Sequence, residues 1–121
     1  MRVLIVEDEA IVAADVESML YQRGCEPVGT AATGPEAIRQ TREQQPDIVL
    51  MDVRLRGEMS GMEAARQIEA ERRIPVIYVT AFAERVRSQL PPGTRCLAKP
   101  FTPTQLSSML EAVLSERPTA A

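Results

Sequence analysis

Acidic side chains stand at the ends of two apolar runs in the sequence. Glu7 and Asp8 follow the run VLIV near the N-terminus, and Asp52 follows the run IVLM. If these carboxylates meet, two of them about 4 Å apart repel by about 4 kcal/mol at an effective dielectric constant of about 20. A hard divalent cation removes this repulsion, and Mg²⁺ prefers carboxylate oxygens and water. The sequence therefore predicts a Mg²⁺ site of Glu7, Asp8 and Asp52, to which Arg54 adds its backbone carbonyl.

Thr80 and Lys99 stand at the ends of two further apolar runs. Lys99 supplies a positive charge that can pair with Asp52 or with an incoming anion, and Thr80 supplies a small hydroxyl donor. A metal ion, an ammonium group and a hydroxyl group around one carboxylate form a site for a phosphoryl group, with Asp52 as the nucleophile. Each residue alone has a plain structural explanation, and Glu9 is assigned to a helix N-terminus rather than to this site.

Strand-like apolar runs alternate with helix-like patterns along the chain, and these elements must bring the polar residues together. The alternation indicates an α/β fold, in which a doubly wound, five-stranded parallel sheet carries helices on both faces. Ligands bind such sheets at the carboxyl ends of the strands, where the polar residues stand. The expected strands are 3–6, 27–31, 48–51, 75–79 and 95–98. The expected helices are 10–23, one from Thr33-Gly34-Pro35 to about Gln45, 62–71, 83–90, and one after the capping box Thr102–Gln105 that buries Leu106, Met109, Leu110 and Val113.

Length and composition exclude several classes of protein. The 121 residues fit one domain, and a net charge of −3 with a pI near 5.0 argues against nucleic-acid binding. The chain has no His, which excludes His-based metal sites and catalytic triads. Cys25 and Cys96 form no CxxC pair, so a reduced, cytoplasmic protein is expected. We expect no signal peptide after Met1-Arg2, and no apolar run approaches the about 18 residues that a membrane span needs.

Four motifs carry a resemblance to a known family. In their order and spacing, VLIVEDE, IVLMDVRL, VIYVTAFAE and LAKPF resemble the receiver domain of bacterial two-component response regulators. The resemblance extends from Arg2 to about Ser115 and implies a receiver domain at 1–116 with a short tail at 117–121, either as a stand-alone protein or as part of a longer one. It also implies a flavodoxin-like fold with strand order 2-1-3-4-5.

The resemblance implies a role for each site residue. Asp52 takes a phosphoryl group from the phosphohistidine of a sensor histidine kinase or a phosphotransfer protein. Asp8 binds Mg²⁺ directly with help from Glu7, while Thr80 and Lys99 contact the phosphoryl oxygens. The domain is then a phosphoacceptor with self-catalysed, Mg²⁺-dependent phosphotransfer and dephosphorylation, and it is not a turnover enzyme. In this family the bond corresponding to Lys99–Pro100 is usually cis.

The sequence departs from the family at Cys96, where a Tyr or Phe usually acts as a rotameric switch. Tyr78 and Phe82 flank Thr80 instead, a pattern that occurs among stand-alone receivers, although Ala81 stands where those sequences tend to have glycine. We therefore expect helix 83–90 and its preceding loop to carry the switching, which a change in amide exchange on phosphorylation would reveal. A partner protein or a second copy is expected to read the face of helix 83–90, strand 95–98 and the last helix.

Three other functions remain open at this stage. A flavodoxin-like cofactor binder needs a phosphate-binding loop after the first strand, and the acidic EDEA has the opposite chemistry. A phosphatase with an Asp nucleophile typically has a second acid two residues later, where this chain has Arg54. A binding module that ignores phosphorylation is the remaining alternative. Ile11 stands on the polar side of the first helix, where it either docks a partner helix or packs under the neighbouring loop.

Overall fold

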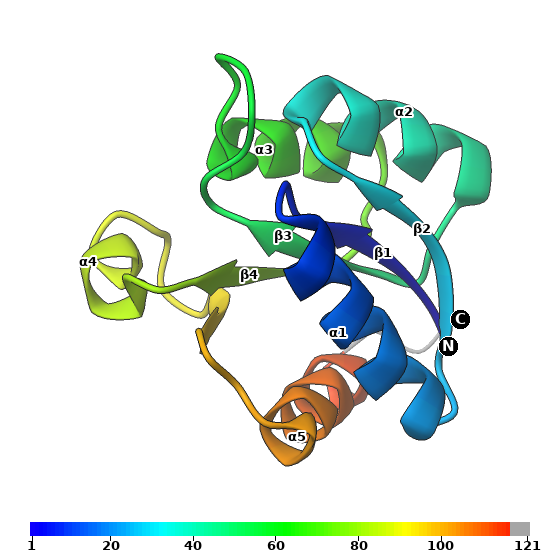
Figure 1. The fold of residues 1–121 in the computed structure, drawn as a ribbon. Coiled ribbons are helices and arrows are strands. Elements are labelled where there is room, and N and C mark those ends of the chain that lie inside the picture. The colour runs from blue at the N-terminus through cyan, green and yellow to red at the C-terminus, as the bar shows by residue number, and fades with distance from the viewer. Residues whose placement is uncertain (117–121) are drawn as a thin grey trace.

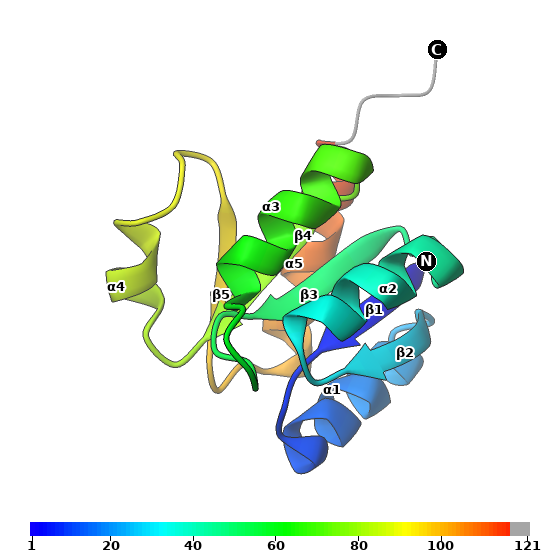
Figure 2. The same cartoon turned by 90° about the horizontal axis from the view of Figure 1, so that it is seen from above.

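The computed structural model describes residues 1–116, and the predicted tail at 117–121 lies outside them. A parallel sheet of five strands has the order β2-β1-β3-β4-β5, which confirms the predicted fold and strand order. Helices α2, α3 and α4 lie on one face of this sheet, and α1 and α5 lie on the other (Figures 1 and 2). The strands are β1 Arg2–Val6, β2 Glu26–Ala31, β3 Ile48–Asp52, β4 Val76–Thr80 and β5 Arg95–Ala98; the helices are α1 Ala10–Gln22, α2 Gly34–Gln44, α3 Gly61–Glu71, α4 Ala83–Arg87 and α5 Pro103–Ser115.

The central strands form where the sequence has uninterrupted apolar runs, because helices cover both faces of the sheet there. Every residue of β3 and β4 is buried. Side chains alternate between two hydrophobic cores: Leu4 and Met51 face the α2–α3 side, whereas Ile5 and Leu50 face the α1–α5 side. In the register of the sheet, Val6 pairs with Met51, so the residues that follow β1 lie beside the end of β3.

Hydroxyl side chains start three of the helices. The Oγ1 atom of Thr33 accepts a hydrogen bond from the Glu36 N–H at 3.2 Å, and Ser60 Oγ accepts one from the Glu63 N–H at 3.2 Å. Thr102 and Gln105 form the predicted capping box. These contacts satisfy backbone donors that the first turn of a helix leaves unpaired. They fix these helix starts at the edge of the sheet where the strands end (Figure 1).

Helix α4 is shorter than the predicted helix 83–90. It ends at Arg87, and the chain continues in turns in which Gln89 N–H donates to the Val86 carbonyl and Leu90 N–H to the Arg87 carbonyl. Pro91 and Pro92 prevent the helix from continuing past Leu90, because proline lacks a helical donor and disfavours helical geometry in the residue before it. Met109, which was predicted to be buried, is half-buried and packs against the core on the α1–α5 side.

The other boundaries match the predicted ones or differ from them by one residue, and Asp52 and Thr80 are the last residues of their strands rather than the first residues beyond them. Within residues 1–116, no helix combines the length and the apolar character that crossing a membrane requires.

Candidate functional site

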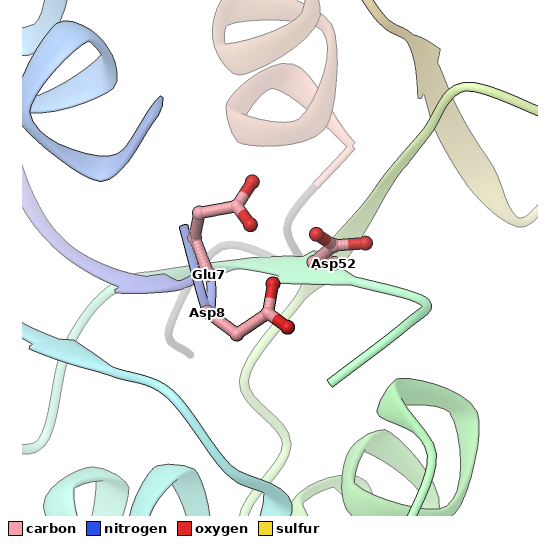
Figure 3. Close-up of side chains that lie close together, drawn as sticks. All are labelled: Glu7, Asp8 and Asp52. Carbon is pink, nitrogen blue, oxygen red and sulfur yellow. The ribbon is translucent and has the colours of Figure 1, made fainter. Parts of the chain in front are cut away.

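Three carboxylates converge at the carboxyl ends of β1 and β3. One oxygen of each of Glu7, Asp8 and Asp52 lies within 4.8 Å of the others, and Figure 3 shows the three side chains gathered at the ends of the two strands. Glu7 and Asp52 are each 7% exposed, whereas Asp8 is half-buried. The parallel register explains this arrangement, because neighbouring strands bring the residues at their ends to one edge.

Lys99 reaches the cluster from the end of β5. Its Nζ atom donates to Glu7 Oε1 at 2.5 Å and to Asp52 Oδ2 at 2.9 Å. The contact with Asp52 confirms a predicted pairing. The sequence did not predict the contact with Glu7, because the order of elements does not decide which of two nearby carboxylates an ammonium group will meet.

Burial and pairing oppose each other in this cluster. Burial raises the pKa of Glu7 to about 7, although the hydrogen bond from Lys99 acts in the other direction. Burial alone lowers the pKa of Lys99, but its contacts with two carboxylates outweigh this effect and raise the pKa above its ordinary value. Lys99 therefore stays protonated at neutral pH, and the cluster of three acids holds one fixed cation.

Thr80 is the last residue of β4 and follows Val79, the residue that pairs with Asp52 of β3. Thr80 is 4% exposed. Its Oγ1 atom accepts a hydrogen bond from the Phe82 N–H at 3.1 Å. The hydroxyl hydrogen is then available for an acceptor, which agrees with the donor role expected of Thr80.

The loop between β3 and α3 forms hydrogen bonds with two residues of the cluster. The Arg54 N–H donates to Asp52 Oδ1 at 3.0 Å, which fixes one carboxylate oxygen, while the coordination of a metal by the Arg54 carbonyl stays a prediction. Arg56 donates to the Asp8 carbonyl at 3.4 Å and its backbone forms an isolated parallel bridge with Thr33. Arg56 was not among the predicted site residues, and its signal in the sequence is its place in the basic, glycine-containing loop after Asp52.

Gly61 lets α3 begin directly against the end of β3. A Cβ atom at this position would lie 2.0 Å from the Asp52 carbonyl oxygen and 3.0 Å from the Val53 Cα. The Gly61 N–H also donates to the Val53 carbonyl at 2.9 Å. The absence of a side chain at residue 61 thus permits the close approach that holds the backbone of Asp52 in place.

Three other predicted features have clear outcomes. The Lys99–Pro100 peptide is cis. Cys96 is 4% exposed, burial raises the pKa of its thiol, and its carbonyl accepts a hydrogen bond from the Arg87 guanidinium at 3.2 Å. Ile11 is 85% exposed on α1, so the alternative that it packs under the neighbouring loop is wrong.

The donor set suits a hard cation. All its side-chain ligand atoms are carboxylate oxygens, and the group offers one oxygen from each of Glu7, Asp8 and Asp52 within a span that one ion can bridge. Lys99 forms ion pairs with Glu7 and Asp52 but not with Asp8. The single ammonium charge therefore does not balance three carboxylates, and a divalent ion could do so. A flavodoxin-like cofactor site needs a phosphate-binding loop after β1, and this chain has acidic residues there. The donor set therefore argues against such a cofactor site.

Comparisons with known proteins agree with this geometry. The family model of the response regulator receiver domain matches residues 3–111. The transcriptional regulatory protein PdtaR of Mycobacterium tuberculosis is 37% identical, across 94% of this chain and 57% of its own length. The crystal structure of the response regulator PhyR from Brucella abortus has a TM-score of 0.87 at 36% identity, covering 94% of this chain and 47% of PhyR.

A third relative holds a metal. The receiver domain of sensor histidine kinase PA1611 from Pseudomonas aeruginosa, solved with a magnesium ion coordinated in the active site cleft, has a TM-score of 0.83 at 32% identity. That match covers 95% of this chain and 98% of the domain. The chain spans about half the length of PdtaR and PhyR, whereas it matches almost all of the PA1611 domain. By the extent of the family match and the identity to these relatives, the chain belongs to the family of response regulator receiver domains.

Proposed function

We propose that this receiver domain accepts a phosphoryl group on Asp52 from the phosphohistidine of a sensor histidine kinase or a phosphotransfer protein. The observation that supports this most directly is the position of Asp52, which is buried between two other acids and in contact with Lys99. A buried carboxylate with one oxygen fixed by a backbone N–H and the other by an ammonium group is oriented before a donor arrives.

The reaction follows from these contacts. An Asp52 carboxylate oxygen attacks phosphorus, the bond from phosphorus to the donor nitrogen breaks, and the donor keeps the electron pair as a free imidazole. Lys99 and the Thr80 hydroxyl then lie at the strand ends beside the new phosphoryl oxygens and stabilise their charge. Glu7, Asp8, Asp52 and the Arg54 carbonyl would hold Mg²⁺, which would supply further positive charge at this site. Water would later hydrolyse the acyl phosphate to inorganic phosphate and the free Asp52 carboxylate. We propose that the domain acts as a phosphoacceptor in signalling and not as a turnover enzyme.

Wild-type protein is expected to gain one phosphoryl group when it is incubated with acetyl phosphate and Mg²⁺. The physical reason is that the small donor needs only the aligned carboxylate and the cation site, without a docked kinase. Intact mass spectrometry measures the adduct, and a sample with EDTA in place of Mg²⁺ is the control. An unmodified mass under all conditions, together with no thermal stabilisation by Mg²⁺, would favour a binding module that ignores phosphorylation.

The donor protein is expected to dock beside α1 in the cytoplasm. A groove of about 340 Å³ lies between α1 and the segment after β5, and its apolar walls include Val12, Met19 and Phe101. Lys99 also lines this groove, so it opens next to the phosphoacceptor. Ile11 is exposed on the same helix, four residues before Asp15 at the groove wall.

Replacing Ile11 with Asp is expected to slow phosphotransfer from the cognate kinase about tenfold, because it removes an apolar contact and adds a charge to the interface. The rate of labelling by acetyl phosphate should stay unchanged. Tyr21→Asp is the matched control, since Tyr21 is a second exposed apolar residue of α1, 63% exposed, near the opposite end of the helix. Equal rates of kinase transfer for wild type and Ile11→Asp would rule out a docking role.

The phosphorylated domain is proposed to act through the face of α4, β5 and α5. A downstream protein or a second copy of the chain would bind there.

A further inference from the structure

Two guanidinium groups contact the ring of Phe82. The guanidinium carbon of Arg54 lies 4.9 Å from the ring centroid, and that of Arg85 lies 5.8 Å from it. Arg54 belongs to the loop after Asp52, whereas Arg85 belongs to α4. The ring is 45% exposed, and cation–π contacts at such exposed positions are weak. The contacts therefore join the phosphoacceptor loop to α4 through one residue without holding it firmly.

The backbone of Phe82 makes a second connection to the site. Its N–H donates to the Thr80 hydroxyl oxygen, and Phe82 is the residue before the first turn of α4. The Arg54 side chain and the Thr80 hydroxyl thus connect Phe82 to the ends of two strands, since Thr80 is the last residue of β4 and Arg54 follows the last residue of β3 by two positions. The backbone of Arg54 also donates to Asp52 Oδ1.

The side chain of Arg54 is available for another partner. Lys99 already contacts two carboxylates, and Arg56 donates to the Asp8 carbonyl. Among residues 1–116, no carboxylate lies within ion-pair distance of the Arg54 guanidinium. The guanidinium lies over the Phe82 ring instead. A long, flexible side chain with a fixed positive charge thus starts from the residue whose amide contacts the phosphoacceptor.

We propose that the Arg54 side chain is a phosphoryl-binding group, held on the Phe82 ring while Asp52 is unmodified and transferred to the phosphoryl group when Asp52 is phosphorylated. The proposal rests on the proposed function, because it needs a phosphoryl group on Asp52. A phosphoryl dianion offers the guanidinium charge-assisted, bidentate hydrogen bonds, and these are stronger than an exposed cation–π contact. Arg54 is therefore expected to exchange partners without any change in the fold.

This exchange gives phosphorylation a path to α4. When Arg54 leaves the ring, Phe82 loses its side-chain contact to the phosphoacceptor loop and keeps the hydrogen bond from its N–H to the Thr80 hydroxyl oxygen. The residue that precedes α4 is then held less firmly to the site. The path does not involve residue 96, where this chain has a buried Cys whose side chain is too small to act as an aromatic switch.

Binding of beryllium fluoride, a phosphoryl mimic, in the presence of Mg²⁺ tests the proposal through an equilibrium constant. Arg54→Ala is expected to weaken this binding about tenfold, because a charge-assisted contact is lost. Phe82→Leu is expected to strengthen it about two- to fivefold, because Arg54 no longer has to leave the ring. Arg85→Ala is the matched control, since it removes the other guanidinium from the same ring, and it should change the binding less than about twofold.

NMR gives a second measurement on the same samples. The chain has only 2 Phe residues, so Phe82→Leu identifies the Phe82 ring signals directly. In the free wild-type protein the Arg54 side-chain N–H should show a ring-current shift, and this shift should disappear when beryllium fluoride binds.

The outcomes separate this proposal from the proposed function. If wild-type protein forms no adduct with acetyl phosphate and binds no beryllium fluoride, the proposed function fails and this proposal fails with it. If the adduct forms but Arg54→Ala binds the mimic as wild type does, only the role of Arg54 is overturned. Weaker binding in both Arg54→Ala and Phe82→Leu would also overturn it, because the two residues would then act together as structural supports.

Discussion

Replacing Asp52 with Asn is expected to abolish phosphorylation by acetyl phosphate and by the kinase. Asn has nearly the same shape as Asp, but its amide is not a nucleophile that can form an acyl phosphate. Lys99 keeps its contact with Glu7 in this variant, so the fold around the site should be retained. Intact mass spectrometry should show one phosphoryl group on wild-type protein and none on Asp52→Asn.

Asp8→Asn is the informative control for this experiment. It removes one carboxylate of the predicted Mg²⁺ site while leaving the nucleophile and its contacts with Arg54 and Lys99 in place. We expect slower labelling that needs more Mg²⁺, rather than none. An adduct on Asp52→Asn equal to that of wild type would contradict the assignment and identify another side chain as the acceptor.

Gly61→Ala is expected to lower the free energy of unfolding by about 3 kcal/mol, the upper part of the usual range for overpacking. The new Cβ atom would meet the Asp52 carbonyl oxygen at 2.0 Å, and two backbone segments must separate to make room for it. The separation also shifts the backbone of the phosphoacceptor, so the folded fraction should be labelled more slowly. Urea unfolding followed by circular dichroism measures the loss, provided that the dependence on urea concentration stays the same.

Gly34→Ala is the matched control for Gly61→Ala, because both residues are the first of a helix. At residue 34 the three nearest atoms to a Cβ atom would all belong to the Met59 side chain, with the sulfur at 2.6 Å, Cγ at 2.8 Å and Cβ at 3.0 Å. We therefore expect a smaller loss of about 1–2 kcal/mol, since a Met side chain can move more readily than the backbone of β3. Equal losses in the two variants would show that the close approach of α3 to β3 does not matter.

The sequence predicted the fold and the members of the acidic cluster because both depend on local patterns. A buried strand such as β3 needs an uninterrupted apolar run, and a polar residue directly after it must lie at the sheet edge. The rest depends on the directions of side chains in three dimensions. Lys99 contacts Glu7 as well as Asp52, and Arg54 contacts the ring of Phe82, which is 28 positions away in the sequence. The periodicity of the sequence reveals neither contact.

The length of α4 was mispredicted for a related reason. Val86 and Leu90 have helical spacing, but two apolar residues do not determine where a short helix ends. Pro91 limits how far the helix could extend, but it does not decide the end at Arg87. The site roles of Thr80 and Lys99, and metal coordination by the Arg54 carbonyl, remain predictions.

The hydrogen bond from Arg87 to the Cys96 carbonyl has a consequence for solubility. In the sheet formed by residues 1–116, β5 is one edge strand, paired with β4, and β2 is the other. At each edge a side chain from a nearby helix occupies a strand carbonyl: Arg87 of α4 binds that of Cys96, and Gln40 of α2 binds that of Thr30 at 2.7 Å. Open edges invite strands of other molecules, and occupied carbonyls, with Pro27 in β2, make such pairing unfavourable. The same side chains that anchor two helices thus protect the sheet against aggregation.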